Sequence, residues 1–173
     1  TAGIVSTFAD EFDLWEETIT TNLTSVMYLS KLVLPHLEES VKKHGHASLI
    51  VNSSIMGFLK SGAISLVRPC PPLVYPLTLE QRLTCPFPLI DVASKHGVSG
   101  WTLSLFDAVK NKGIKVTVVN PALTDTPMAE GVMQYAKKIA IPASSIAHAI
   151  HFAATFPEGG CPTEITVHAQ YSE

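Results

Sequence analysis

The sequence predicts an α/β fold in which a parallel β-sheet carries helices on both faces. Short apolar runs at 47–52 and 114–120, each bounded by turn residues, are typical of buried parallel strands. Longer stretches with apolar residues three and four positions apart are typical of helices that lie against such a sheet. The alternation of strand and helix indicates right-handed crossovers between parallel strands.

The first half of the chain predicts one long helix followed by a strand. Residues 1–4 could end a strand, and Asp13, after a polar loop, could cap the helix. Pro35 lies near the end of this helix and predicts a kink or an early stop. A turn at 44–46 precedes the strand. The apolar face of the helix is formed by Ile19, Leu23, Val26, Met27, Val33, Leu34 and Leu37.

The second half predicts a helix from about Asp91 that ends at Gly113, a glycine placed as a C-terminal cap. A strand at 114–120 follows. A helix over 143–155, which Ser144 or Ser145 could cap, precedes a weaker strand at 164–168. The apolar face of the first of these helices is formed by Val98, Trp101, Leu105, Phe106 and Val109.

The segment 60–90 interrupts this order, because it is rich in proline and has neither helical nor alternating periodicity. Such a segment is expected to be an irregular insertion, a lid or a disordered stretch. The rest of the chain is long enough for one domain, so residues 1–173 are treated as a single, partial domain.

The composition indicates a globular protein, with 46% hydrophobic and 16% charged residues. A net charge of -3 gives no reason to expect nucleic acid or a membrane as partner. Three irregularly spaced cysteines predict neither a disulfide framework nor a zinc site, and we expect no bound metal. Without a signal peptide or transmembrane run, a cytoplasmic location is expected, although the start at Thr1 suggests a piece of a longer protein.

Several polar residues follow the predicted strands, where ligands bind in open α/β sheets. Ser54, the pair Asp91 and Lys95, and Thr126 could all lie at this edge. Asp91 and Lys95 are four residues apart, so they share a helix face and should form a salt bridge. Asn22 lies in mid-helix, where a solvated amide is the commoner outcome and a buried one must find a partner.

Five motifs, in the correct order, resemble the C-terminal two thirds of a short-chain dehydrogenase/reductase. The resemblance covers nearly the whole chain except 60–90. The motifs are Thr1-Ala-Gly3, like the end of the family's Asn-Asn-Ala-Gly; Asn22-Leu23, like the helix with the structural asparagine; Leu49-Ile-Val-Asn-Ser-Ser54, like the strand ending in the catalytic serine; Ala93-Ser-Lys95, like the Tyr-x-Ala-Ser-Lys helix; and Val119-Asn-Pro-Ala-Leu-Thr-Asp-Thr126, like the strand end that holds the nicotinamide.

The resemblance implies a truncated Rossmann-like, doubly wound parallel sheet of three layers (α/β/α) without its first strands. It implies hydride transfer between NAD or NADP and a small alcohol or carbonyl substrate, with a tyrosine as proton donor. Asn22 would support a proton-relay water, Ser54 would bind the substrate oxygen, and Lys95 would bind the nicotinamide ribose and lower the tyrosine pKa. The resemblance also implies a homodimer, in which the helices over 19–37 and 92–110 would pack against a partner chain. The implied cofactor-binding residues are Ala2, Gly3, Asn52, Lys95, Pro121, Ala122, Thr124 and, at the carboxamide, Thr126.

The chain departs from the family pattern at the proton donor and at the cofactor phosphates. Asp91 stands at the tyrosine position, and a carboxyl with a pKa of about 3.9, lowered further by Lys95, is a poor acid at neutral pH. The sequence also has no Gly-x-x-x-Gly-x-Gly turn for the pyrophosphate. A non-catalytic fragment or pseudoenzyme that keeps only the dimer surface is therefore the alternative, and an unpaired strand edge predicts poor solubility.

The connection between Ser54 and position 91 is far longer than in the family. Tyr75 lies inside it but has Leu79, not lysine, four residues later. Removal of the coding sequence between points within the codons of Cys70 and Asp91 would create a tyrosine directly before Val92. We therefore hypothesise that the proline-rich segment is translated intron or a similar gene-model error.

Other functions are less well supported. His148 and His151 are about one helical turn apart, but no third ligand lies nearby in sequence. A serine hydrolase would need a Gly-x-Ser-x-Gly turn, which the sequence lacks.

Overall fold

A computed structural model describes residues 3–4, 11–57, 89–129 and 140–170 of the chain, so most of the segment 60–90 lies outside the described residues. The helices and strands alternate as the sequence predicts. In chain order they are α1 (Phe12–Ile19), the π-helix η1 (Thr20–Thr24), α2 (Ser25–His44), β1 (Ala47–Asn52), the 3₁₀ turn η2 (Ile55–Gly57), α4 (Leu89–Val109), η4 (Lys110–Lys112), β2 (Ile114–Pro121), β3 (Thr124–Asp125), η5 (Pro127–Ala129), β4 (Ile141–Pro142), α6 (Ala143–Ala154) and β5 (Glu164–Val167).

The main sheet is parallel, with the strand order β1-β2-β5 in the described part of the chain. β1 and β2 pair from Ala47 with Ile114 onward, and β2 pairs with β5 from Val118 with Glu164. The central strand β2 is buried along nearly its whole length, as expected for a parallel strand that is covered on both faces. A short parallel pair, β3 with β4, lies beyond the carboxyl end of β2.

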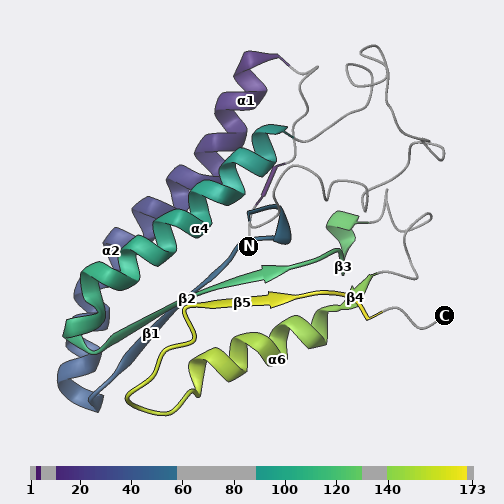
Figure 1. Cartoon of the computed structure of the whole chain (residues 1–173). Helices are drawn as coiled ribbons and strands as arrows, with labels where there is room; N and C mark the ends of the chain where they lie inside the picture. Colours follow the sequence, from purple (N-terminus) through teal and green to yellow (C-terminus); the bar gives the residue numbers. More distant parts are fainter. Residues whose placement is uncertain (1–2, 5–10, 58–88, 130–139, 171–173) are drawn as a thin grey trace.

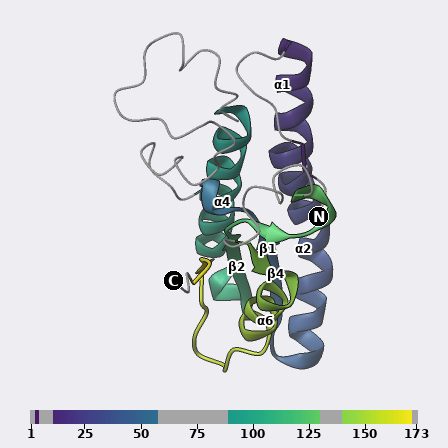
Figure 2. The same cartoon turned by 90° about the vertical axis from the view of Figure 1, so that its right-hand side faces the viewer.

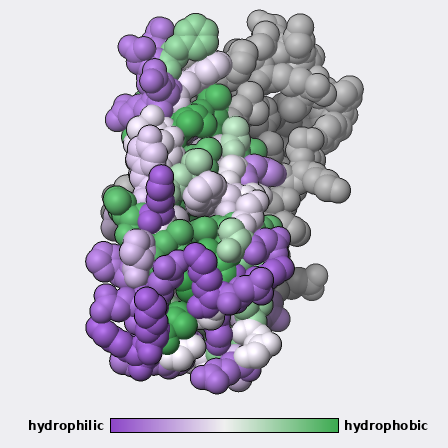
Figure 3. Space-filling model, turned by 90° about the vertical axis from the view of Figure 1, so that its left-hand side faces the viewer, coloured by the Kyte–Doolittle hydropathy of each residue, from purple (hydrophilic) through white to green (hydrophobic). Residues whose placement is uncertain are grey.

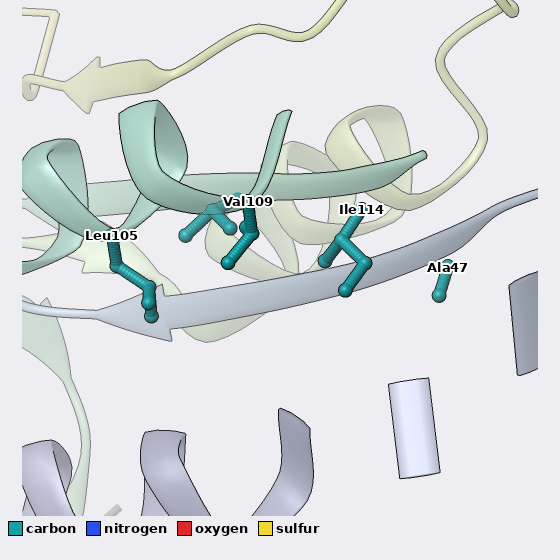
Figure 4. Packing of buried hydrophobic residues seen from close by; sticks show 5 residues of the cluster. Ala47, Leu105, Val109 and Ile114 are labelled. Atoms are coloured by element: carbon teal, nitrogen blue, oxygen red, sulfur yellow. The ribbon is translucent and has the colours of Figure 1, made fainter. Parts of the chain in front are cut away.

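Helices cover both faces of this sheet, as predicted. Figures 1 and 2 show α2 and α4 together on one side and α6 on the other. Between the first pair and the sheet lies a buried cluster in which Leu105 and Val109 project from α4 towards β1 (Figure 4). A second cluster, around Val119, Ile141 and Ile146, lies between α6 and the strands. The fold is therefore a three-layer α/β/α arrangement with a sheet of few strands.

The predicted long first helix is present but differs in three details. It begins at Phe12 with Glu11 at the N-cap position and no side-chain cap, so the prediction of Asp13 as the cap is wrong. A π-turn, η1, lies in its middle. The early stop at Pro35 is also wrong, because the helix continues to His44 and ends at Gly45, whose φ of 83° is left-handed.

The later helices end as predicted but do not all begin as predicted. Gly113, with φ 75°, ends the helical run of α4 and η4. α6 begins directly after Pro142, and neither Ser144 nor Ser145 caps it, because both lie inside the helix. Among the described residues, no helix combines the length and the apolar character that crossing a membrane requires.

Candidate functional site

Asn22, in η1, links three segments that are far apart in sequence. Its side chain is 3% exposed. Its Oδ1 accepts a 2.8 Å hydrogen bond from the Ile4 backbone N–H, and its Nδ2 donates to the Ile4 carbonyl at 2.8 Å. The same Nδ2 lies 3.1 Å from both Asp91 Oδ1 and Ser94 Oγ on α4. The solvated alternative for Asn22 is therefore wrong, and this amide joins the start of the chain to the first turn of α4.

Asp91 is directed towards Asn22 and does not form the expected salt bridge. No Asp91–Lys95 ion pair within 4.0 Å is found. The carboxyl is 7% exposed, and burial raises its pKa although the charge of Lys95 acts in the opposite direction. Lys95 lowers the Asp91 pKa, as predicted, but desolvation outweighs a charge that is not in contact, so the pKa is raised overall.

The end of β1 is fixed against the turn of α4 that carries Lys95. Ser53 Oγ donates to the Lys95 carbonyl at 3.3 Å. Gly57 in η2 lies so close that a Cβ there would be 2.4 Å from the same carbonyl oxygen. Between them, Ser54 Oγ accepts a 3.2 Å hydrogen bond from the Met56 N–H, which fixes the turn. The structure thus brings the predicted residues Ser54 and Lys95 onto adjoining elements.

The end of β2 is attached to the same helix. Ser99 Oγ on α4 lies 3.4 Å from Oδ1 of the fully buried Asn120, whose Nδ2 donates to Glu164 at 2.8 Å. Directly after Asn120 come Pro121 and Ala122, and the Ala122 N–H donates to the Val167 carbonyl at 2.9 Å. The predicted cofactor residues of this stretch therefore end or follow β2 at the carboxyl edge where Ser54 follows β1.

The two threonines of this stretch are held by the local backbone. Thr124 Oγ1 donates to the Ala122 carbonyl at 2.9 Å, and Thr126 Oγ1 to the Thr124 carbonyl at 3.4 Å. Both side chains are half-buried. Each hydroxyl keeps lone pairs that could accept a further hydrogen bond.

Asn52 offers an acceptor that no described protein group uses. It is the last residue of β1, and its Oδ1 is buried without a hydrogen-bond partner. A buried acceptor left unpaired costs about 1–3 kcal/mol, so a donor from outside the described residues would satisfy it. Of the two predicted cofactor-binding residues at the start of the chain, Gly3 is described and half-buried, whereas Ala2 lies outside the described residues.

A metal site finds no support in the part of the chain that the structure describes. No three His, Cys, Asp or Glu side chains there come together as ligands. His148 and His151 are both exposed on α6.

Sequence reasoning missed the serines that hold the site together. Ser94 is fully buried, lies 3.1 Å from Asn22 and donates to the Asp91 carbonyl at 2.7 Å. Its spacing of three from Asp91 places it on the same helix face, a signal that was available in the sequence. The roles of Ser53 and Ser99 depend on which strand packs against α4, and periodicity alone does not give that.

The comparisons with known proteins agree on one family. The family model described as "short chain dehydrogenase" matches residues 91–137, beginning directly at Asp91. A ketoacyl reductase 1 assigned to the granaticin polyketide synthase of Streptomyces violaceoruber is 35% identical over 77% of this chain and 39% of its own length. The 3-oxoacyl-(acyl-carrier-protein) reductase of Buchnera aphidicola is 30% identical over 80% of this chain and 49% of its own length. The chain thus spans half or less of these two relatives.

Solved structures share the fold. A 3-ketoacyl-(acyl-carrier-protein) reductase from Brucella melitensis complexed with NADH superposes with a TM-score of 0.72 at 17% identity, over 96% of this chain and 62% of that one. The F189W variant of actinorhodin polyketide ketoreductase with NADPH also gives 0.72, at 19% identity, over 98% of this chain and 64% of that one. At these identities the likeness establishes the Rossmann-like fold alone.

Proposed function

This chain belongs to the short-chain dehydrogenase/reductase family, and we propose that its residues form the nicotinamide and substrate side of an NAD- or NADP-dependent oxidoreductase site. The reaction is hydride transfer between the cofactor and a small alcohol or carbonyl compound. The observation that carries the proposal is the joining of β1 and β2 to one helix, α4, by Ser53, Gly57 and Ser99. This places Ser54 and Lys95 on adjoining elements at the carboxyl edge of a parallel sheet, where ligands of such folds bind.

The side chains at this edge fit a nicotinamide nucleoside. The half-buried Lys95 would donate to the ribose hydroxyls, and the unpaired Asn52 Oδ1 would accept from a cofactor donor. Thr126 would contact the carboxamide. When bound, the cofactor supplies or accepts the hydride. The sequence has no glycine-rich turn for the pyrophosphate, so the contacts available from these residues lie on the nicotinamide side.

Ser54 would orient the substrate oxygen through its hydroxyl, which already accepts from the Met56 N–H and retains its own proton to donate. Asn22 would hold the start of the chain and α4 in place beside it. The proton, however, has no suitable donor among the described residues. Asp91 stands where the family has its proton-donating tyrosine, and its carboxyl accepts a hydrogen bond from Asn22. We therefore propose that this chain is impaired in catalysis.

The test is Asp91→Tyr, with Asp91→Phe as the matched control that has the ring but no hydroxyl. A positioned general acid contributes a factor of about 10²–10⁴ to the rate. The tyrosine variant should therefore reduce a carbonyl substrate about 10²–10⁴ times faster than either the native chain or the phenylalanine variant. Oxidation of saturating NADH or NADPH is followed by absorbance. Equal rates in all three proteins, or no turnover in any of them, would contradict the assignment.

We also propose that α2 and α4 form a homodimer surface, which a non-catalytic form would retain. The observation behind it is the exposure of large apolar side chains on these two adjacent helices: Tyr28 at 66%, Leu29 at 60% and Leu32 at 67% on α2, and Leu103 at 36% on α4. Figure 3 displays hydrophobic side chains in the middle of the face that these helices present. Exposed apolar patches of this kind mark protein interfaces.

Leu32→Glu tests the dimer, and Lys31→Glu, an exposed neighbour on the same helix, is the control. A charge at the centre of an apolar interface is left unpaired, so Leu32→Glu should shift the protein from dimer to monomer. Light scattering after size exclusion measures the mass. A dimer unaffected by Leu32→Glu, or a monomeric native chain, would refute this surface.

A further inference from the structure

The surroundings of position 91 suit a neutral side chain better than a carboxylate. Asp91 is buried, accepts from the Asn22 amide, and has no cation of the described residues within 4.0 Å. Burial outweighs the attraction of Lys95 and raises the pKa of the carboxyl. A buried charge without a close partner is costly, so this environment penalises the residue that occupies it.

The elements on either side of residues 58–90 are already in contact. Gly57 touches the backbone of Lys95, which lies one helical turn after Asp91, a rise of about 6 Å. A few residues span such a distance, since an extended residue covers about 3.5 Å. The fold therefore needs only a short connection where the sequence has a long one. The family match also begins at Asp91, directly after the segment.

We propose that this protein has a shorter form, made from a message that lacks 63 bases: the last two of codon 70, all of codons 71–90 and the first of codon 91. Because 63 is a multiple of three, the reading frame is kept whether the bases are removed or translated. The removed stretch reads GT at its start when Cys70 is TGT, and AG at its end when Ile90 is ATA, as spliced introns do. The remaining T of codon 70 and AT of codon 91 join as TAT, a tyrosine followed by Val92.

In this form a tyrosine stands four residues before Lys95, on the helix face that carries Ser94 and meets Asn22. A phenol, with an ordinary pKa of about 10, enters that environment uncharged and escapes the cost of burying a charge. Its hydroxyl can both donate and accept a hydrogen bond. The role of this hydroxyl as the proton donor rests on the proposed function, but the existence of the shorter form does not.

Sequencing of transcripts across codons 57–95 tests the shorter form without reference to activity. We expect reads in which codon 69 is followed by TAT and codon 92. If every read from cells that express the gene contains the 63 bases, the inference is overturned.

A second test uses the protein itself. The deletion of residues 71–91 is combined with Cys70→Tyr, and the same deletion with Cys70→Phe or Cys70→Asp provides matched controls. At neutral pH the tyrosine and phenylalanine forms should unfold at higher urea concentrations than the aspartate form, and the difference should narrow in acid as the carboxyl is protonated. An aspartate form as stable as the other two at neutral pH would overturn the inference that this position suits a neutral side chain. Carbonyl reduction confined to the tyrosine form would additionally support the proposed function.

Discussion

Asp91→Asn should stabilise the chain at neutral pH. The substitution keeps the shape of the side chain and an Oδ1 that can accept from Asn22 Nδ2, and it removes the buried charge. The largest cause of the raised Asp91 pKa is desolvation, and asparagine does not suffer the ionic part of that cost.

The sign of this change in stability follows from the linkage between proton binding and folding. Because the pKa of Asp91 in the folded state lies above its ordinary value of 3.8, the folded chain binds the proton more tightly than the unfolded chain does. Stability is therefore highest below that ordinary value and falls as the pH rises through the folded-state pKa. Each tenfold difference in proton affinity between the folded and unfolded chains corresponds to about 1.4 kcal/mol. We therefore expect the asparagine variant to be more stable than the native chain at pH 7.

Urea unfolding followed by circular dichroism at a series of pH values measures this difference. Asp107→Asn, on the exposed side of the same helix, is the control and should change stability by less than about 0.5 kcal/mol. The gain from Asp91→Asn should disappear in acid. A variant that is less stable than the native chain at pH 7, or a difference that grows in acid, would refute the reasoning.

The remaining predictions concern the contacts that assemble the site. Asn22→Ala removes the hydrogen bonds to Ile4, Asp91 and Ser94 and should cost about 3 kcal/mol in urea unfolding, with faster hydrogen exchange at the Ile4 amide; a loss under about 1 kcal/mol would show that Asn22 is not the link. Gly57→Ala brings a methyl within 2.4 Å of the Lys95 carbonyl and should lower stability by about 1–3 kcal/mol, whereas Gly100→Ala, with open space around it, should be neutral or stabilising; equal effects would contradict the close approach. Gly113→Ala should cost about 1 kcal/mol, because φ is 75° there, and an unchanged melting temperature would argue against a left-handed cap.

The sequence predicted β1, β2, β5 and the fold class, because apolar runs and their bounding turns are local signals. It did not predict the short pair β3 and β4, and the described residues 3–4 do not form the strand end that was expected there. It predicted a kink or an early stop at Pro35, and the early stop is wrong. An exposed proline does not end this helix, because the neighbouring Leu34 and Leu37 pack on the core. Packing of the amphipathic face outweighs the lost backbone hydrogen bond.

The site shows the limit of spacing as evidence. Asp91 and Lys95 do share a helix, yet the partner of Asp91 is Asn22, 69 residues away in sequence. No spacing rule finds such a contact. The motif resemblance did place Ser54, Lys95 and Asn22 on adjoining elements, because an ordered set of motifs carries information about tertiary contacts that periodicity lacks.

The central claim is that these residues bind the nicotinamide side of a dinucleotide. Reduced nicotinamide mononucleotide and NADH, titrated into the chain and followed by amide chemical shifts, test it most directly. We predict chemical-shift changes around Asn52, Lys95 and Thr126, similar affinities for both compounds, and weaker binding after Lys95→Met. Two results would contradict the claim. One is NADH binding more than tenfold tighter than binding of reduced nicotinamide mononucleotide, and the other is an affinity for both compounds that Lys95→Met leaves unchanged.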